Sequence, residues 1–223
     1  MDDIKDDMLD DLAKKILYDY DAKTPGTIFK KKVNISISQA WILQSKVAEL
    51  REKRGEKIVG YKIGCTSKSG NQDHVGIKHP AWGRLWENEQ HKTGDILKKE
   101  NYFNPSMEAE FGIKLKRDLN KNNFCFEYLL NSIDTVHSII EIHNLVFHGK
   151  YPHGAELLAN NAIHAGVVCG PGIKNLSWDK ETDLNLIYDG KIVDSWTHKK
   201  WSQDMMSDID WLLNQLNKIG KSL

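Results

Sequence analysis

The sequence predicts an α+β fold, with helices early in the chain and strands in most of the rest. Apolar residues recur at helical spacing in residues 6–20 and 36–50, whereas several later segments alternate apolar and polar residues with the period of a strand. Separate runs of helices and strands are typical of this fold class. We therefore expect a single domain over residues 1–223, helical in residues 1–55 and β-rich in residues 56–223.

The ends of the predicted elements carry their own signals. Ser36 followed by Gln39 predicts a capping box at the start of the second helix, which Gly55 would end. The dipeptide at 189–190, Asp-Gly, lies between two alternating segments and predicts a β-hairpin. Residues 68–90 show no clear periodicity, so we expect a long loop there, of the kind that covers a binding site.

Composition and charge exclude several classes of protein. Lys and Arg total 31, as do Asp and Glu, so the formal net charge is zero and we expect neither nucleic acid nor an anionic membrane as a partner. No apolar segment approaches the roughly 20 residues that a membrane span requires. The three scattered cysteines indicate reduced thiols, and the acidic start lacks the form of a secretory signal. We expect a soluble, cytoplasmic protein.

Residues 105–115 form the most regular strand pattern in the sequence. The odd-numbered positions from 107 to 115 are apolar, whereas Glu108 and Glu110 project side by side from the other face. Two like charges at that distance repel each other, so water, a lysine or a cation must compensate. On this segment alone, a solvated polar face is the commoner explanation.

A second strand pattern, in residues 57–67, places Lys62 between Gly60 and Gly64 on one face. Glycine within a strand often marks the close approach of a ligand or another backbone, and here the glycines leave space around the lysine amine. Lysine is also a side chain that burial readily adapts to acid–base work. A solvent-facing lysine on an edge strand explains the pattern equally well.

A third strand pattern, in residues 135–147, is largely apolar around Glu141. A carboxylate buried without a partner costs several kcal/mol or takes up a proton. Glu141 therefore needs a cation, unless the strand lies at an edge of the sheet and directs this side chain to water.

Convergence of Glu108, Glu110 and Glu141 would form an all-oxygen site, which favours Mg²⁺ or Mn²⁺ over Zn²⁺. An ion there leaves coordination positions for a 2-oxo acid and can stabilise an enolate. Lys62 could hold the substrate carboxylate or move a proton. The nine histidines suggest no competing site, since those at 143, 148 and 153 are five residues apart.

Taken in order, these motifs resemble those of the 2-oxopent-4-enoate hydratase and 4-oxalocrotonate decarboxylase group, within the fumarylacetoacetate hydrolase superfamily. GYKIG, the pair of glutamates in EAEF and the later lone glutamate in IEI are fairly specific together, and the resemblance extends over residues 9–223. The matching pieces are residues 58–64, 66–67, 76–77, 80, 83–85, 108–111, 140–142, 159–162, 167–170 and 210–213.

The resemblance implies a rolled mixed β-sheet with the N-terminal helices packed against it, and assembly into a homo-oligomer. It implies a lyase acting on a short 2-hydroxydienoic or 2-oxo acid, as arises in the bacterial breakdown of aromatic compounds. In a hydratase the dienol ketonises and water adds across the remaining double bond. The expected site residues are Lys62 for catalysis, Glu108, Glu110 and Glu141 for Mg²⁺ or Mn²⁺, and Lys62, Thr66, Ser67 and Gln72 for substrate binding.

Other functions stay open at this point. A decarboxylase of the 4-oxalocrotonate type would use the same metal-bound 2-oxo group as an electron sink, and hydrolysis of an acylpyruvate would need an additional base. A non-catalytic relative that binds a small acid or a partner is a third possibility. It is motivated by Lys78, where some hydratases carry an acidic residue, and by relatives that continue for a few dozen residues past the position of Leu223. Asn144 and Asn160 stand where many relatives carry Asp, which predicts different hydrogen bonding around the ligands.

Overall fold

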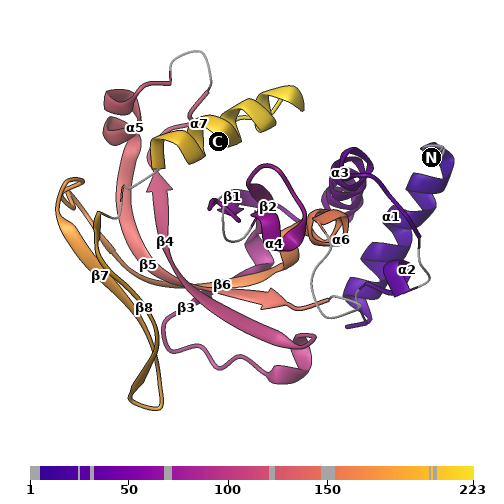
Figure 1. Ribbon diagram of the computed structural model, residues 1–223, viewed down its shortest axis with the longest axis horizontal. Helices are drawn as coiled ribbons and strands as arrows, with labels where there is room; N and C mark the ends of the chain where they lie inside the picture. Colours follow the sequence, from indigo (N-terminus) through magenta and orange to yellow (C-terminus); the bar gives the residue numbers. More distant parts are fainter. Residues whose placement is uncertain are drawn as a thin grey trace. The chain divides into compact units, whose positions relative to one another are not determined.

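Among the described residues, three helices precede the first strand, the two that the sequence predicts and a short one between them (Figure 1). The computed structural model describes residues 6–24, 26–30, 33–67, 72–120, 124–146, 154–200, 202 and 205–223. Its α-helices are α1 (Asp6–Asp21), α2 (Thr27–Lys30), α3 (Ile37–Lys53), α4 (Asp73–Val75), α5 (Phe126–Ser132), α6 (Gly154–Ala159) and α7 (Met205–Lys218). Short 3₁₀ turns are η2 (Glu87–Glu89), η3 (Lys99–Asn101) and η5 (Asn161–Ile163). Among the described residues, no helix combines the length and apolar character needed to cross a membrane.

The strands form three sheets in the part of the chain that the structure describes. Strands β1 (Ile58–Gly64) and β2 (Ala81–Trp86) pair antiparallel, with Lys62 opposite Gly83. A four-stranded sheet has the order β3-β6-β5-β4, formed by β3 (Gln90–Lys92), β6 (His164–Ile173), β5 (Ile133–Asn144) and β4 (Pro105–Leu115). The predicted hairpin is confirmed as β7 (Glu181–Tyr188) and β8 (Lys191–Lys200). This mixture of helices and several sheets confirms the predicted α+β class.

The prediction of one long loop over residues 68–90 is wrong for the segment that forms β2. Five of the six residues of β2 are buried, so this strand shows no alternation between an apolar and a polar face. Arg84 interrupts the apolar character of the segment, yet it is buried because its guanidinium donates to Gln44 Oε1 at 2.8 Å. A buried arginine with a buried partner cannot be recognised from local periodicity. Residues 68–71 lie outside the described residues.

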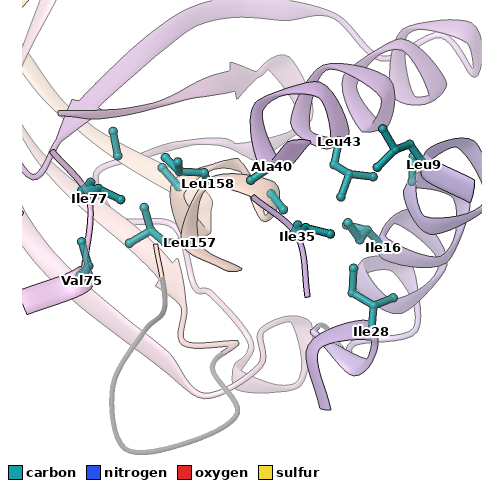
Figure 2. Packing of buried hydrophobic residues seen from close by; sticks show 14 residues of the cluster. Leu9, Ile16, Ile28, Ile35, Ala40, Leu43, Val75, Ile77, Leu157 and Leu158 are labelled. Carbon is teal, nitrogen blue, oxygen red and sulfur yellow. The ribbon is translucent and has the colours of Figure 1, made fainter. Parts of the chain in front are cut away.

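Contacts divide the chain into two compact units, and the predicted single domain stays a prediction. The first unit comprises residues 1–90, 96–106 and 142–166, and the second comprises residues 91–95, 107–141 and 167–223. Apolar side chains of α1, α3 and α6 form the core of the first unit, where Leu9, Ile16, Leu43 and Leu158 are buried (Figure 2). The predicted capping box of α3 is confirmed, because Ser36 and Gln39 exchange side chain–backbone hydrogen bonds.

The core of the second unit joins α5 and α7 to strands β4 and β5. Leu129, Val136 and Leu213 are buried there, and the predicted apolar face of β4 packs against them through Phe111 and other half-buried side chains. Met107 is 53% exposed, so the buried face begins later in the strand than the alternation predicts.

A buried cluster of charges ties the helices of the first unit to the end of β2. Arg51 of α3 donates to Glu89 Oε1 at 2.6 Å and to Glu56 Oε2 at 2.5 Å from the same nitrogen. Tyr20 of α1 donates to Glu89 Oε1 at 2.6 Å, and the Arg51 guanidinium lies 4.1 Å from the centre of the Trp86 ring. One arginine therefore neutralises two largely buried carboxylates and links α1, α3 and η2.

Replacing Arg51 with Met should destabilise the first unit strongly, because the largely buried carboxylate of Glu89 would lose its arginine and that of Glu56 would keep only its contact with Arg54. We expect a loss of about 3–5 kcal/mol in the free energy of unfolding by urea. Arg54→Met is the matched control, since the Arg54 side chain is 37% exposed where that of Arg51 is 6% exposed, and it should cost about 1 kcal/mol or less. Equal losses for the two variants would contradict this role for Arg51.

Tyr20 should make stability fall at alkaline pH. Burial, together with the charge of Glu89, raises the pKa of Tyr20 well above its ordinary value of 10.0. A raised pKa in the folded state means that its stabilisation is complete below about pH 10 and is lost as the pH rises above that value. Tyr20→Phe should remove this contribution, so its unfolding free energy should fall less steeply than that of the wild type above pH 10. Parallel pH curves for the two proteins would show that the tyrosine does not titrate in this way.

Candidate metal centre

Glu141 lies in the interior of the four-stranded sheet. Its strand, β5, has β6 on one side and β4 on the other, and Glu141 is 0% exposed. The alternative of an edge strand that directs this carboxylate to water is therefore excluded. A carboxylate in such surroundings requires compensation for the water it loses, which makes this position a candidate cation site.

A second carboxylate and an imidazole lie beside Glu141. One ligand atom from each of Glu108, Glu141 and His143 lies within 4.8 Å of the other two. Glu108 is on β4 and the other two residues are on the adjacent strand β5. Two oxygen ligands on opposite sides of an ion are about 4.2 Å apart for Mg²⁺ and about 5 Å apart for Ca²⁺. The donor set and its spacing therefore fit a divalent cation.

His143 is the residue of this group that the sequence analysis did not assign to the site. The prediction that the histidines form no competing site rested on the spacing of His143 from the later histidines. The informative signal was the spacing of two from Glu141, which places both side chains on one face of the strand. Glu110, which the sequence predicts as a ligand, is half-buried and shares a face of β4 with Glu108, but it is not among the three residues whose ligand atoms lie within 4.8 Å.

Lys62 is half-buried on β1, and its amine has two polar neighbours in the first unit. Lys62 Nζ lies 3.4 Å from His143 Nε2 and 3.5 Å from the carbonyl oxygen of Ala162. A Cβ atom at Gly64 would lie 3.5 Å from Lys62 Nζ, which is an ordinary contact distance, so the predicted space beside the amine does not depend on this glycine. The structure thus brings Lys62 to one of the candidate metal-site residues.

The predicted substrate-binding residues differ in their exposure. Thr66 and Ser67 are exposed directly after β1, whereas Gln72 is buried. Gln72 Nε2 donates to the carbonyl oxygen of Cys65 at 2.9 Å, and Cys65 has a left-handed φ of 54°. The observed contact of Gln72 therefore fixes the backbone that leads from β1 to Thr66.

A left-handed turn, η5, lies next to the Lys62 amine. Its three residues, Asn161, Ala162 and Ile163, have φ values of 57°, 50° and 57°. Left-handed backbone costs an L-residue other than glycine roughly 1–2 kcal/mol, and consecutive residues of this kind persist only where surrounding structure holds them. The carbonyl group that lies near Lys62 belongs to the middle residue of this turn.

The resemblance implies Asp in many relatives at the positions of Asn144 and Asn160. The side chains of both asparagines hydrogen-bond to backbone groups. Asn144 Oδ1 accepts from the backbone N–H of Phe103 at 2.9 Å, and Asn160 Nδ2 donates to the carbonyl oxygen of Glu156 at 2.8 Å. The first contact uses an oxygen that an aspartate also has, whereas the second requires the amide. Lys78 is exposed.

Comparisons with known proteins support the predicted resemblance. No family model matches the chain. The chain is 25% identical over 189 residues to a 2-keto-4-pentenoate hydratase from Burkholderia vietnamiensis, and 27% identical over 196 residues to one from Paraburkholderia phymatum. Each match covers 82% of this chain and 71% of the relative.

Among solved structures, the fold is similar to that of 4-oxalocrotonate decarboxylase from Pseudomonas putida G7, complexed with magnesium and adipate. The TM-score is 0.84 at 19% identity, and the match covers 99% of this chain and 84% of the decarboxylase. A second structure of that decarboxylase, complexed with calcium and acetate, gives a TM-score of 0.83. Similarity in sequence to the hydratases and in fold to the decarboxylase confirms the resemblance predicted from the motifs.

Mg²⁺ should raise the thermal stability of the protein if the carboxylates bind it. An ion that binds only the folded state stabilises it by about 2.7 kcal/mol at one hundred times its Kd. Glu141→Gln and Glu108→Gln should abolish the Mg²⁺-dependent rise in melting temperature. Glu127→Gln, on α5, is the matched control and should keep it. An unchanged Mg²⁺ response in Glu141→Gln would refute the assignment of this carboxylate as a ligand.

Proposed function

We propose that this chain is a metal-dependent hydro-lyase that adds water to a short 2-hydroxydienoic acid, such as 2-hydroxypenta-2,4-dienoate. The observation that carries the proposal is the buried carboxylate Glu141, which lies with Glu108 and His143 in a group suited to a divalent cation. The predicted kind of enzyme agrees with the hydratase names of the relatives.

The proposed ligands of the ion, Mg²⁺ or Mn²⁺, are Glu108, Glu110 and Glu141. A neutral imidazole has a single lone pair, on one of its two nitrogens. If the Lys62 ammonium donates to His143 Nε2, this lone pair is used and the ring cannot also bind a metal. Glu110 is then the proposed third ligand, since it lies on the same face of β4 as Glu108.

A divalent ion bound there would supply Lewis-acid polarisation of the 2-oxo group of the substrate. Lys62 supplies positive charge beside this position, where it can hold the substrate carboxylate or transfer a proton during ketonisation. His143 orients the lysine amine. Thr66, Ser67 and Gln72 complete the proposed substrate site, with the two hydroxyls as hydrogen-bonding groups and Gln72 as the residue that fixes their backbone.

Water addition follows from the chemistry of the ketonised substrate. Ketonisation moves the enol proton to C5, which leaves a C3=C4 double bond conjugated with the 2-oxo group. This bond is electron-poor at C4, so the hydroxyl group of water bonds to C4 and a proton bonds to C3. Water is the only co-reactant and no oxidant is needed, so the product is a 4-hydroxy-2-oxo acid.

The remaining expectations from the resemblance belong to the same proposal. They are a rolled form of the mixed sheet, assembly into a homo-oligomer, a cytoplasmic location and a role in the breakdown of aromatic compounds. Decarboxylation of a 2-oxo diacid is the second candidate, favoured by the fold similarity to 4-oxalocrotonate decarboxylase.

An absorbance assay on metal-depleted protein tests the proposal. Consumption of 2-hydroxypenta-2,4-dienoate should appear when Mg²⁺ or Mn²⁺ is added and disappear with a chelator. Faster turnover of 2-oxohex-3-enedioate, with release of CO₂, would identify the decarboxylase instead. A folded protein that binds the metal but converts neither acid would refute the enzymatic proposal.

Lys62→Met should lower kcat by about 10²–10⁴-fold, the usual contribution of a positioned acid or base. Lys57→Met is the matched control, because Lys57 immediately precedes the same strand and its side chain is 71% exposed, and its kcat should equal that of the wild type. Wild-type activity in Lys62→Met would exclude the lysine from the reaction.

A further inference from the structure

We propose that Asn161 is a positioning residue for Lys62, acting through the left-handed turn η5. This inference rests on the proposed function, because it concerns the amine to which that function assigns catalysis. The residues that carry it all lie in the first unit, and none of them is a proposed metal ligand.

The side chain of Asn161 clamps the backbone of a single residue of β2. Its Oδ1 atom accepts from the backbone N–H of Arg84 at 2.7 Å, and its Nδ2 atom donates to the carbonyl oxygen of Arg84 at 2.9 Å. The amide thus satisfies both backbone groups of Arg84, as a neighbouring strand would do. Asn is also among the few residues besides glycine that enter the left-handed region readily.

The turn approaches β2 so closely that the residue before Arg84 must be glycine. A Cβ atom at Gly83 would lie 2.5 Å from the carbonyl oxygen of Asn161 and 3.3 Å from its Oδ1 atom. Gly83 is also the residue that pairs with Lys62 across β1 and β2. The close approach of the turn therefore occurs directly opposite the catalytic lysine.

The strand that Asn161 clamps is itself held by buried side chains. Arg84 donates to Gln44 Oε1 at 2.8 Å, and Gln44 Nε2 donates to the carbonyl oxygens of Trp82 and Leu158, each at 3.0 Å. Gln44 thereby joins α3 to β2 and to the end of α6, which leads into the turn. The clamp is anchored on a rigid part of the unit.

The consequence for Lys62 is geometric. The carbonyl oxygen of Ala162, the residue after Asn161, lies 3.5 Å from Lys62 Nζ, and His143 Nε2 lies 3.4 Å from the same atom. Without the amide of Asn161, the strained turn has no side-chain bond to β2 and can relax, which moves the Ala162 carbonyl away from the amine. Lys62 then loses one of the groups that define where its charge lies.

Steady-state kinetics of Asn161→Ala and Asn161→Gly test this proposal, with Asn160→Ala as the matched control. The control removes a neighbouring amide whose bond stays within α6 and the residue that follows it. We expect both Asn161 variants to lose about 10–100-fold in kcat, the effect of misplacing a reacting group by roughly 1 Å, with KM changed much less. Asn160→Ala should keep the wild-type kcat.

The two Asn161 variants distinguish loss of the side-chain hydrogen bonds to Arg84 from loss of the left-handed backbone conformation. Glycine adopts the left-handed backbone at no steric cost, so Asn161→Gly keeps the turn accessible and folds even if Asn161→Ala does not. Wild-type kcat in Asn161→Gly would overturn the proposal, because it would show that the clamp is not required. A wild-type protein without turnover would instead refute the proposed function.

A readout that needs no metal and no turnover completes the test. Acetylation of lysines with limiting acetic anhydride, followed by peptide mass spectrometry, reports the accessibility of each amine in metal-free protein. Lys62 should react severalfold faster in Asn161→Gly than in the wild type, relative to Lys57 as internal reference. Equal rates in the two proteins would show that Asn161 does not hold the amine.

Discussion

The burial of the Glu141 carboxylate in the middle of a sheet is the constraint on which the candidate site depends. An ionised group without water must be compensated by a nearby cation or by hydrogen bonds, or it binds a proton. The adjacent strand places Glu108 within reach of it, and the spacing of two along β5 adds His143. Sheet geometry alone therefore concentrates these groups, because neighbouring strands hold facing side chains only a few ångströms apart. Two carboxylates and an imidazole this close together form a group to which a divalent cation can bind.

Lys62, which contacts His143, depends on a different kind of constraint. Lys62 projects from the β1–β2 pair, and its surroundings combine a glycine in its own strand, a glycine in the paired strand and a left-handed turn. Gly83 admits the turn, which a side chain would exclude, whereas a Cβ atom at Gly64 would make an ordinary contact with the lysine amine. The strained backbone of η5 therefore lies beside the Lys62 amine, whose position matters for the proposed reaction.

Strands β4 and β7 could be predicted from the sequence, since apolar and polar residues alternate along both, and the Asp-Gly turn predicted the hairpin with β8. The apolar residues around Glu141 indicated a carboxylate that needs a cation, but they left an edge strand open. Strand β2 could not be predicted, since its buried arginine donates a hydrogen bond to Gln44, which is 40 positions away in the chain. The left-handed turn and the Asn161–Arg84 clamp were equally hidden, as they join residues 77 positions apart. The spacing of His143 from Glu141 indicated that both side chains lie on one face of the strand. The prediction considered only the spacing of His143 from other histidines.

We propose that the carboxylates of β4 and β5 together hold one divalent cation. An anomalous difference map from crystals of the protein soaked in Mn²⁺ measures this most directly. We expect a single strong peak within about 2.5 Å of carboxylate oxygens of Glu108, Glu110 and Glu141, with Lys62 not bound to the ion. A peak at other residues, or no peak between these strands at millimolar Mn²⁺, would contradict it.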